Sequence, residues 1–188
     1  EYIIAEEPDE PLASLSVRDF VGEVAARSSA PGGGSVAAAI AAMGAGLGSM
    51  VAKLTLGVRK FESVDTRMRE LVPPLHAAAQ ALIPLIDADT DAFTDFVAAL
   101  RLPSGTEVEK SYRAAQMQAG LKAAIEVPLN TMRTADAAWD AMMEVAQHGN
   151  IASKSDVEVG ARALEMGIWG AYKNVVINMA DVTDTAYR

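Results

Sequence analysis

The stretch SSAPGGGSVAAAIAAMGAGLGSMVA, residues 28–52, contains no charged side chain. Its first seven residues are typical of a loop, and the rest is largely alanine and glycine at a length that suits a helix of several turns. A helix without a polar face is either enclosed by other helices or spans a membrane. Because alanine and glycine are weakly hydrophobic compared with leucine, we interpret this stretch as the central helix of a bundle and predict no membrane span.

The sequence outside this stretch also favours helices, because apolar residues recur every three or four positions and no segment alternates as a strand does. Ser16 and Thr106 are placed to cap helices. We therefore predict an all-α fold, a bundle of about five or six helices. The expected helical segments are about 16–27, 35–56, 65–101, 106–147 and from 155 onward, with kinks or breaks at prolines 73, 74, 84 and 128.

Composition narrows the class of protein. The 188 residues are 51% hydrophobic and 22% charged, which fits one globular domain. With no cysteine and two histidines, we expect no disulfide, no thiolate chemistry and no metal site, in a reducing cytoplasmic compartment. The net charge of −9 argues against nucleic acid as a partner. Residues 1–13 are acidic, contain prolines and do not resemble a signal peptide, so we expect a linker or N-terminal tether before a domain at 14–188.

One carboxylate is out of place in the segment LIPLIDADTDAFTDFVAAL, residues 82–100. Asp87, Asp91 and Asp95 recur at i, i+4 and i+8, which predicts an acidic stripe facing water. Asp89 lies on the opposite face, since its neighbours at three, four and seven positions are apolar. Burial raises the pKa of a carboxyl group toward the range of a general acid or base. A structural hydrogen-bond acceptor or salt-bridge partner is the alternative, whereas an EF-hand loop is excluded because Ala92 replaces its required glycine.

Three further groups are candidate binding residues. The glycine-rich entry to the central helix exposes backbone amides that bind anions or carbonyl oxygens, although a plain turn capped by Ser35 is equally compatible. Arg59 and Lys60 follow the end of that helix and are, by themselves, ordinary surface cations. Asn174 and Asn178 end a strip of small residues on one face of the last helix. They fit a ligand or a closely packed helix, or they satisfy each other.

Several of these segments occur together, and in the same order, in one known family. Residues 14–188 resemble the cyclodeaminase part of formiminotransferase-cyclodeaminase and, more distantly, bacterial methenyltetrahydrofolate cyclohydrolases. The motifs that carry the resemblance are SAPGGGSVAAA, GVRKF, DTRMRELVPPLHAA, DADTDAF, the GN turn, SDVEVGARALEMG and GAYKNVVIN.

The resemblance implies an all-helical homodimer with folate in a groove at the subunit interface. It also implies an essential aspartate for acid and base chemistry, which aligns with Asp89. The other site residues that it implies are Gly33, Gly34 and Ser35 at the folate or the dimer seam, Arg59 and Lys60 on the carboxylates of the glutamyl tail, and Asp156, Asn174 and Asn178 on polar groups of the pterin.

The implied activity is that of a formimidoyltetrahydrofolate cyclodeaminase, which converts 5-formimino-tetrahydrofolate to 5,10-methenyl-tetrahydrofolate with release of ammonia in histidine degradation. The folate, including its polyglutamylated forms, is the substrate, and no metal is required. A formiminotransferase domain precedes this region in the bifunctional members. The alternatives are a methenyltetrahydrofolate cyclohydrolase, in which water opens the same ring, and a folate-binding or dimerisation module without catalysis.

Overall fold

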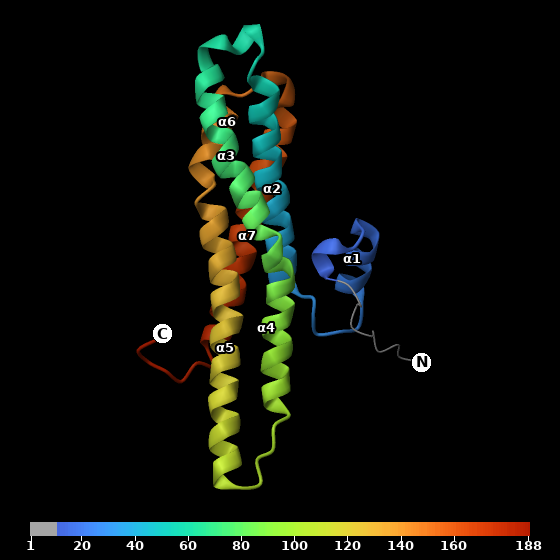
Figure 1. Cartoon of the computed structure of the whole chain (residues 1–188), viewed down its shortest axis with the longest axis vertical. Coiled ribbons are helices and arrows are strands. Elements are labelled where there is room, and N and C mark those ends of the chain that lie inside the picture. Colours follow the sequence, from blue (N-terminus) through green and yellow to red (C-terminus); the bar gives the residue numbers. More distant parts are fainter. Residues whose placement is uncertain (1–10) are drawn as a thin grey trace.

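The computed structural model describes residues 11–188, which form an elongated bundle of α-helices without a strand (Figure 1). The predicted all-α class is confirmed. Five helices of 17 or more residues build the bundle, within the described part of the chain, and two shorter ones complete it. The α-helices are α1 Val17–Ala25, α2 Gly33–Thr55, α3 Asp65–Leu82, α4 Pro84–Leu100, α5 Glu107–Asp136, α6 Trp139–His148 and α7 Lys154–Met179, and the 3₁₀ segments are η1 Leu12–Ser14, η2 Arg59–Val64 and η3 Ile151–Ser153.

Helix α2 is the central helix that the charge-free stretch predicts. Thirteen of its 23 residues are buried, and it packs against α3, α4, α5, α6 and α7. Small residues allow its close approach to α7. A Cβ atom added at Gly44 would lie 2.7 Å from the Gly160 carbonyl oxygen, and one added at Gly167 would lie 2.5 Å from the Ala41 Cβ. The two helices therefore touch nearly backbone to backbone.

Within residues 11–188, two stretches have the length and composition of a membrane span, α2 and the segment Arg59–Leu100. Most of the apolar window of α2 is buried inside the bundle, as expected of a core helix. The second window is less buried. The absence of a membrane span therefore stays a prediction.

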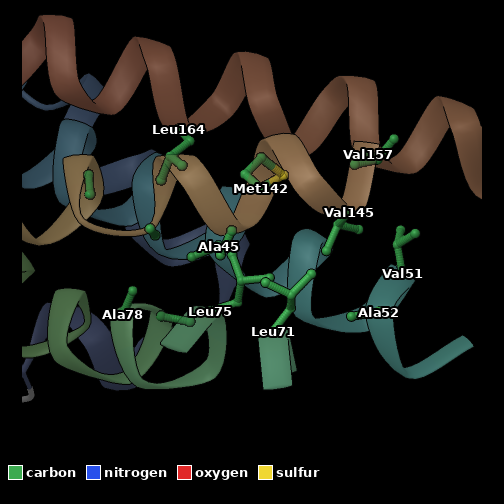
Figure 2. Close-up of a cluster of buried hydrophobic side chains, with 14 of the residues drawn as sticks. Ala45, Val51, Ala52, Leu71, Leu75, Ala78, Met142, Val145, Val157 and Leu164 are labelled. Carbon is green, nitrogen blue, oxygen red and sulfur yellow. The ribbon is translucent and has the colours of Figure 1, made fainter. Parts of the chain in front are cut away.

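The main hydrophobic core lies between α2, α3, α6 and α7 (Figure 2). Leucines of α3, such as Leu75, pack against Met142 and Val145 of α6 and Leu164 of α7, all of them almost completely buried. A second, smaller cluster joins α2 to α4 through Ala38, Ala39 and Ile86 and includes Leu12 of η1. This second cluster fixes the first turns of α2 against α4.

The N-terminal segment differs from expectation where it is described. Residues 1–10 of the predicted linker lie outside the described residues, but Leu12 is buried, and its amide donates a hydrogen bond of 2.5 Å to Asp87 Oδ1. The Ala13 amide donates to Asp87 Oδ2 at 3.3 Å. Of the predicted water-facing stripe, Asp91 and Asp95 are exposed, whereas Asp87 instead anchors η1. Helix α1 begins, as predicted, after the Ser16 cap.

The predicted helix at 106–147 is interrupted at a different place than expected. Thr106 caps α5 as predicted, in a capping box with Glu109, but the break falls at residues 137–138 and not at Pro128, which lies inside α5. Proline has no N–H, so Pro128 leaves the carbonyl of Ala124 without its helical donor. Asn178 Nδ2 of α7 donates to that oxygen at 2.9 Å. A side chain of α7 thus replaces the missing bond, and α5 continues.

This replacement predicts a coupling between Asn178 and Pro128. Asn178→Ala should lower the free energy of unfolding by about 1 kcal/mol, because the Ala124 carbonyl loses its donor. In a Pro128→Ala background residue 128 supplies its own N–H, so the same substitution should cost much less. Urea unfolding of the four proteins gives the interaction energy. An equal cost in both backgrounds would show that Asn178 does not compensate for the proline.

Candidate functional site

Asp89 lies in the second turn of α4, where this helix packs against the first turn of α2 (Figure 1). The Asp89 side chain is half-buried. The Ser35 backbone N–H donates to Asp89 Oδ2 at 2.8 Å, and the Ser35 hydroxyl donates to the same oxygen at 3.2 Å. Helix α2 begins at Gly33 after the N-cap Gly32, so Ser35 is not the cap that the sequence allowed. Ser35 instead binds the carboxylate.

The first turn of α2 fits the carboxyl group only because residue 34 is glycine. A Cβ atom at Gly34 would lie 2.6 Å from Asp89 Oδ2 and closer still to Oδ1. At Gly33 the corresponding atom would lie 3.4 Å from Asn174 Nδ2 of α7, an ordinary contact. Three elements therefore meet here, and they bring together Gly33, Gly34, Ser35, Asp89 and Asn174.

The surroundings of Asp89 favour its neutral form. Burial raises the pKa of the Asp89 carboxyl, the two hydrogen bonds from Ser35 lower it, and burial prevails. No lysine or arginine among the described residues contributes to this shift, and none forms an ion pair with Asp89 in residues 11–188. The interpretation as a salt-bridge partner therefore finds no support. A carboxyl group with a raised pKa beside helix amides is suited to proton transfer.

The two asparagines of α7 do not satisfy each other. Asn174 Nδ2 donates to the Gly170 carbonyl one turn earlier, at 2.9 Å, and its amide lies next to Gly33. Asn178 Nδ2 is engaged by Ala124 of α5. Asn174 therefore belongs to the site around Asp89, whereas Asn178 has a structural role beside it.

The remaining predicted residues lie at the other end of the bundle. Arg59 and Lys60 are exposed in η2, beyond the C-terminal end of α2, with the Lys60 Nζ 5.5 Å from the centre of the Phe61 ring. The 23 residues of α2 separate them from the glycine turn, a helix length of about 34 Å. Asp156 is in the first turn of α7, about 27 Å along that helix from Asn174. Within one chain, these residues do not meet Asp89.

Thr90 is a site residue that the sequence did not single out. Its Oγ1 lies 3.2 Å from Ser35 Oγ, so it reaches the same hydroxyl that binds Asp89. The only signal in the sequence is adjacency to Asp89, which helical periodicity does not use. No group of three or more histidine, aspartate or glutamate side chains suited to a metal ion occurs within residues 11–188.

Known proteins resemble this chain in sequence and in fold. A profile of the formiminotransferase-cyclodeaminase family matches residues 16–188. The formimidoyltransferase-cyclodeaminase of Sus scrofa is 50% identical over 100% of this chain and 35% of its own length, so the chain spans about a third of that relative. The methenyltetrahydrofolate cyclohydrolase of Methylorubrum extorquens is 34% identical over 92% of this chain and 83% of its own length. The crystal structure of formiminotetrahydrofolate cyclodeaminase from Thermotoga maritima has a TM-score of 0.82 at 28% identity, covering 93% of this chain and 83% of that one.

The contact between Gly34 and Asp89 predicts a sharp contrast between two alanine substitutions at helical glycines. Gly34→Ala should displace the carboxyl group and reduce turnover by about a hundredfold or more, the usual contribution of a positioned acid or base. Gly22→Ala in α1 is the matched control, because no atom lies within 4 Å of its added Cβ. It should retain turnover and gain up to about 1 kcal/mol of stability from helix propensity. Steady-state kinetics and thermal unfolding at one protein concentration test both, and a fully active Gly34→Ala protein would contradict the geometry.

Proposed function

The chain belongs to the formiminotransferase-cyclodeaminase family, and we propose that it is a formimidoyltetrahydrofolate cyclodeaminase. Its substrate is 5-formimino-tetrahydrofolate, and its products are 5,10-methenyl-tetrahydrofolate and ammonia. The observation that carries the proposal is the half-buried Asp89, held by Ser35 at the N-terminal turn of α2. Relatives named for this activity align with the whole chain, which supports the substrate class.

For this reaction the protein needs only to position the reacting groups of the folate and to transfer a proton. The N10 nitrogen of the folate attacks the formimino carbon, so the substrate supplies both nucleophile and electrophile. Asp89 removes the proton from N10 as the new C–N bond forms. It then returns that proton to the amine, which leaves as ammonia when its own C–N bond breaks. The protonated formimino substrate carries one positive charge, and the methenyl product carries one as well. The proton taken from N10 is the proton given to the leaving amine, so a single carboxyl group can carry out both transfers.

The chain around Asp89 supplies what this proton transfer needs. The amide and hydroxyl of Ser35 stabilise the ionised form that accepts the proton, and burial makes the protonated form accessible in the next step. Asn174 lies next to the exposed Gly33, which directly precedes the Gly34 that contacts the carboxyl group. The side-chain oxygen of Asn174, which accepts no hydrogen bond within residues 11–188, and the backbone amides of the glycine turn can bind polar groups of a pterin.

A methenyltetrahydrofolate cyclohydrolase is the second candidate, because a relative of that name aligns with 92% of the chain. The same carboxyl group can activate water for ring opening. Identity of 50% to a cyclodeaminase, against 34% to the cyclohydrolase, favours deamination. Separate assays with 5-formimino-tetrahydrofolate and with 5,10-methenyl-tetrahydrofolate decide between the two activities. A cyclodeaminase releases ammonia from the first substrate as the methenyl chromophore appears, whereas a cyclohydrolase consumes the methenyl chromophore of the second. A non-catalytic module would do neither.

Asp89→Asn separates the catalytic from the structural role of this residue. Turnover of 5-formimino-tetrahydrofolate should fall by about a hundredfold to ten-thousandfold, because the amide cannot exchange the proton. The folded state raises the pKa of Asp89, so the stability it contributes is present below the unfolded pKa and is lost as pH rises through the folded pKa. Above the folded pKa the ionised, half-buried group is unfavourable, and there the Asn variant should be at least as stable as the wild type.

Thermal unfolding at pH 7 and the rate of methenyl formation test both halves of this prediction. A loss of about 3 to 5 kcal/mol would indicate that a buried charge had lost its partner. A stable Asp89→Asn protein with wild-type turnover would refute the proposed function.

We also propose that the protein is a homodimer, and that exposed apolar faces of α2 and α7 form the dimer interface. A stripe of uncharged residues follows the outer side of α2 at helical spacing, with Met43 58% exposed and Leu54 49% exposed. Beside it, α7 exposes Val159, Met166 and Ile177. Large exposed apolar faces are typical of interaction sites. The members of the α2 stripe are Val36, Ile40, Met43, Leu47, Met50 and Leu54.

A second copy of the chain bound to this face would also explain how Arg59 and Lys60 can serve the site at Asp89, although they lie far from it within one chain. A two-fold axis through the middle of the α2 stripe pairs the two α2 helices antiparallel, so each end of one lies beside the opposite end of the other. Arg59 and Lys60 of the partner subunit then lie beyond the glycine turn of this chain, near Asp89. Two cations at that place suit the carboxylates of a folate glutamyl tail.

Mixed dimers test this arrangement. Two differently tagged chains, one Asp89→Asn and one Arg59→Ala/Lys60→Ala, are co-expressed and purified through both tags. One site of each mixed dimer then holds Asp89 together with both basic residues. We expect about half of the wild-type kcat and a wild-type KM for the polyglutamylated substrate, because lost uniform binding raises KM alone.

The double alanine homodimer is the control and should show a raised KM with kcat nearly unchanged. A mixed dimer with the same raised KM would place the basic residues and Asp89 in one chain. Light scattering that finds a monomer at micromolar concentration would contradict the shared site altogether.

A further inference from the structure

The hydrogen bonds around Asp89 differ between its two carboxyl oxygens. Oδ2 accepts from the amide of Ser35 at 2.8 Å and from its hydroxyl at 3.2 Å, whereas among residues 11–188 no hydrogen bond reaches Oδ1. Oδ1 lies over the Cα of Gly34, where a side chain is missing. A proton on Oδ2 would face two donors, so Oδ1 is the oxygen on which a proton fits.

The direction of these bonds extends to Thr90. Ser35 is completely buried, and its hydroxyl has one proton, which is given to Asp89. The bond of 3.2 Å between the two hydroxyls must then run from Thr90 Oγ1 to Ser35 Oγ. Thr90 thereby holds the Ser35 hydroxyl in the rotamer that binds Oδ2. Three residues form a chain of donors that ends at the carboxylate.

We infer that Thr90, acting through Ser35, is a positioning residue that assigns proton exchange to Oδ1 of Asp89. This inference rests on the proposed function, because it concerns the proton that Asp89 transfers. The cooperative effect of such a chain is larger in a partly buried site than in water. Without the Thr90 hydroxyl, Ser35 is free to rotate, and the ionised carboxylate loses a donor that favours it.

Within residues 11–188 of one chain, Ser35 hydrogen-bonds to Asp89 and no charged side chain does. The shift in the pKa of Asp89 arises from burial and from Ser35, with no contribution from a charged side chain. On α2 no ionisable residue occurs between Arg27 and Lys53. The ionisable residues closest along the neighbouring elements are otherwise occupied or exposed: Asp87 binds η1, Asp91 faces solvent, Glu126 of α5 accepts from Tyr187 at 2.7 Å, and Lys173 of α7 lies over the rings of Trp169 and Tyr172.

The experiment compares Thr90→Val, which keeps the shape, with Thr90→Ser, which keeps the hydroxyl. We measure the pH dependence of kcat/KM for methenyl formation from 5-formimino-tetrahydrofolate. The acidic limb of the profile, where Asp89 becomes protonated, should move upward by about half to one pH unit in Thr90→Val, as expected for the loss of one hydrogen bond to a charged group. Thr90→Ser should restore the wild-type limb.

A purely structural Thr90 gives a different result, since lost packing lowers stability without moving the pH profile. An unmoved limb in Thr90→Val, or the same shift in Thr90→Ser, overturns the inference. If Thr90→Val does not fold, Ser35→Ala takes its place, and its acidic limb should move in the same direction. Asp89→Asn distinguishes failure of the proposed function from failure of this inference. Wild-type turnover in Asp89→Asn refutes the proposed function. An inactive Asp89→Asn protein together with an unmoved acidic limb in Thr90→Val refutes only the role of Thr90.

Discussion

The contact between the Asp89 carboxyl group and the first turn of α2 requires the rest of the fold to hold two backbones in register. Gly34 leaves no room for a Cβ atom beneath the carboxyl group, and the Ser35 amide must point at it. That register depends on the cluster in which Leu12, Ala38, Ala39 and Ile86 join η1, α2 and α4. Small residues along the rest of α2 then allow α7 to approach closely enough to place Asn174 beside Gly33.

The lack of charge in residues 33–52 of α2 has a structural and a chemical consequence. A helix with no polar face is stable in water only when other helices cover it, and this requirement makes α2 the centre of the bundle. The same lack of charge leaves Asp89 beside the amide and hydroxyl of Ser35, and within residues 11–188 of its own chain no cation pairs with it. Desolvation therefore dominates over hydrogen bonding, and the pKa of Asp89 is raised.

The sequence predicted the parts of the molecule that follow from local periodicity. The all-α class, the helix caps at Ser16 and Thr106 and the inward position of Asp89 need only spacing and residue type. The anchoring of η1 by Asp87 and the contact between Thr90 and Ser35 depend on residues distant in sequence. Pro128 shows the difference clearly, because its lost hydrogen bond follows from local chemistry, whereas the donor that replaces it comes from Asn178, 50 residues later.

The elongated shape of the bundle explains why the predicted site divides into two groups. The glycine turn lies at the beginning of α2 and the basic pair follows its end, so its 23 residues hold the two groups apart by the whole length of the helix. No loop within residues 11–188 spans that distance, since both groups lie on or directly beside helices. The substrate that we propose has a reactive pterin at one end and a charged tail at the other, and the proposed two-fold pairing along α2 is the arrangement in which both groups of residues serve one folate.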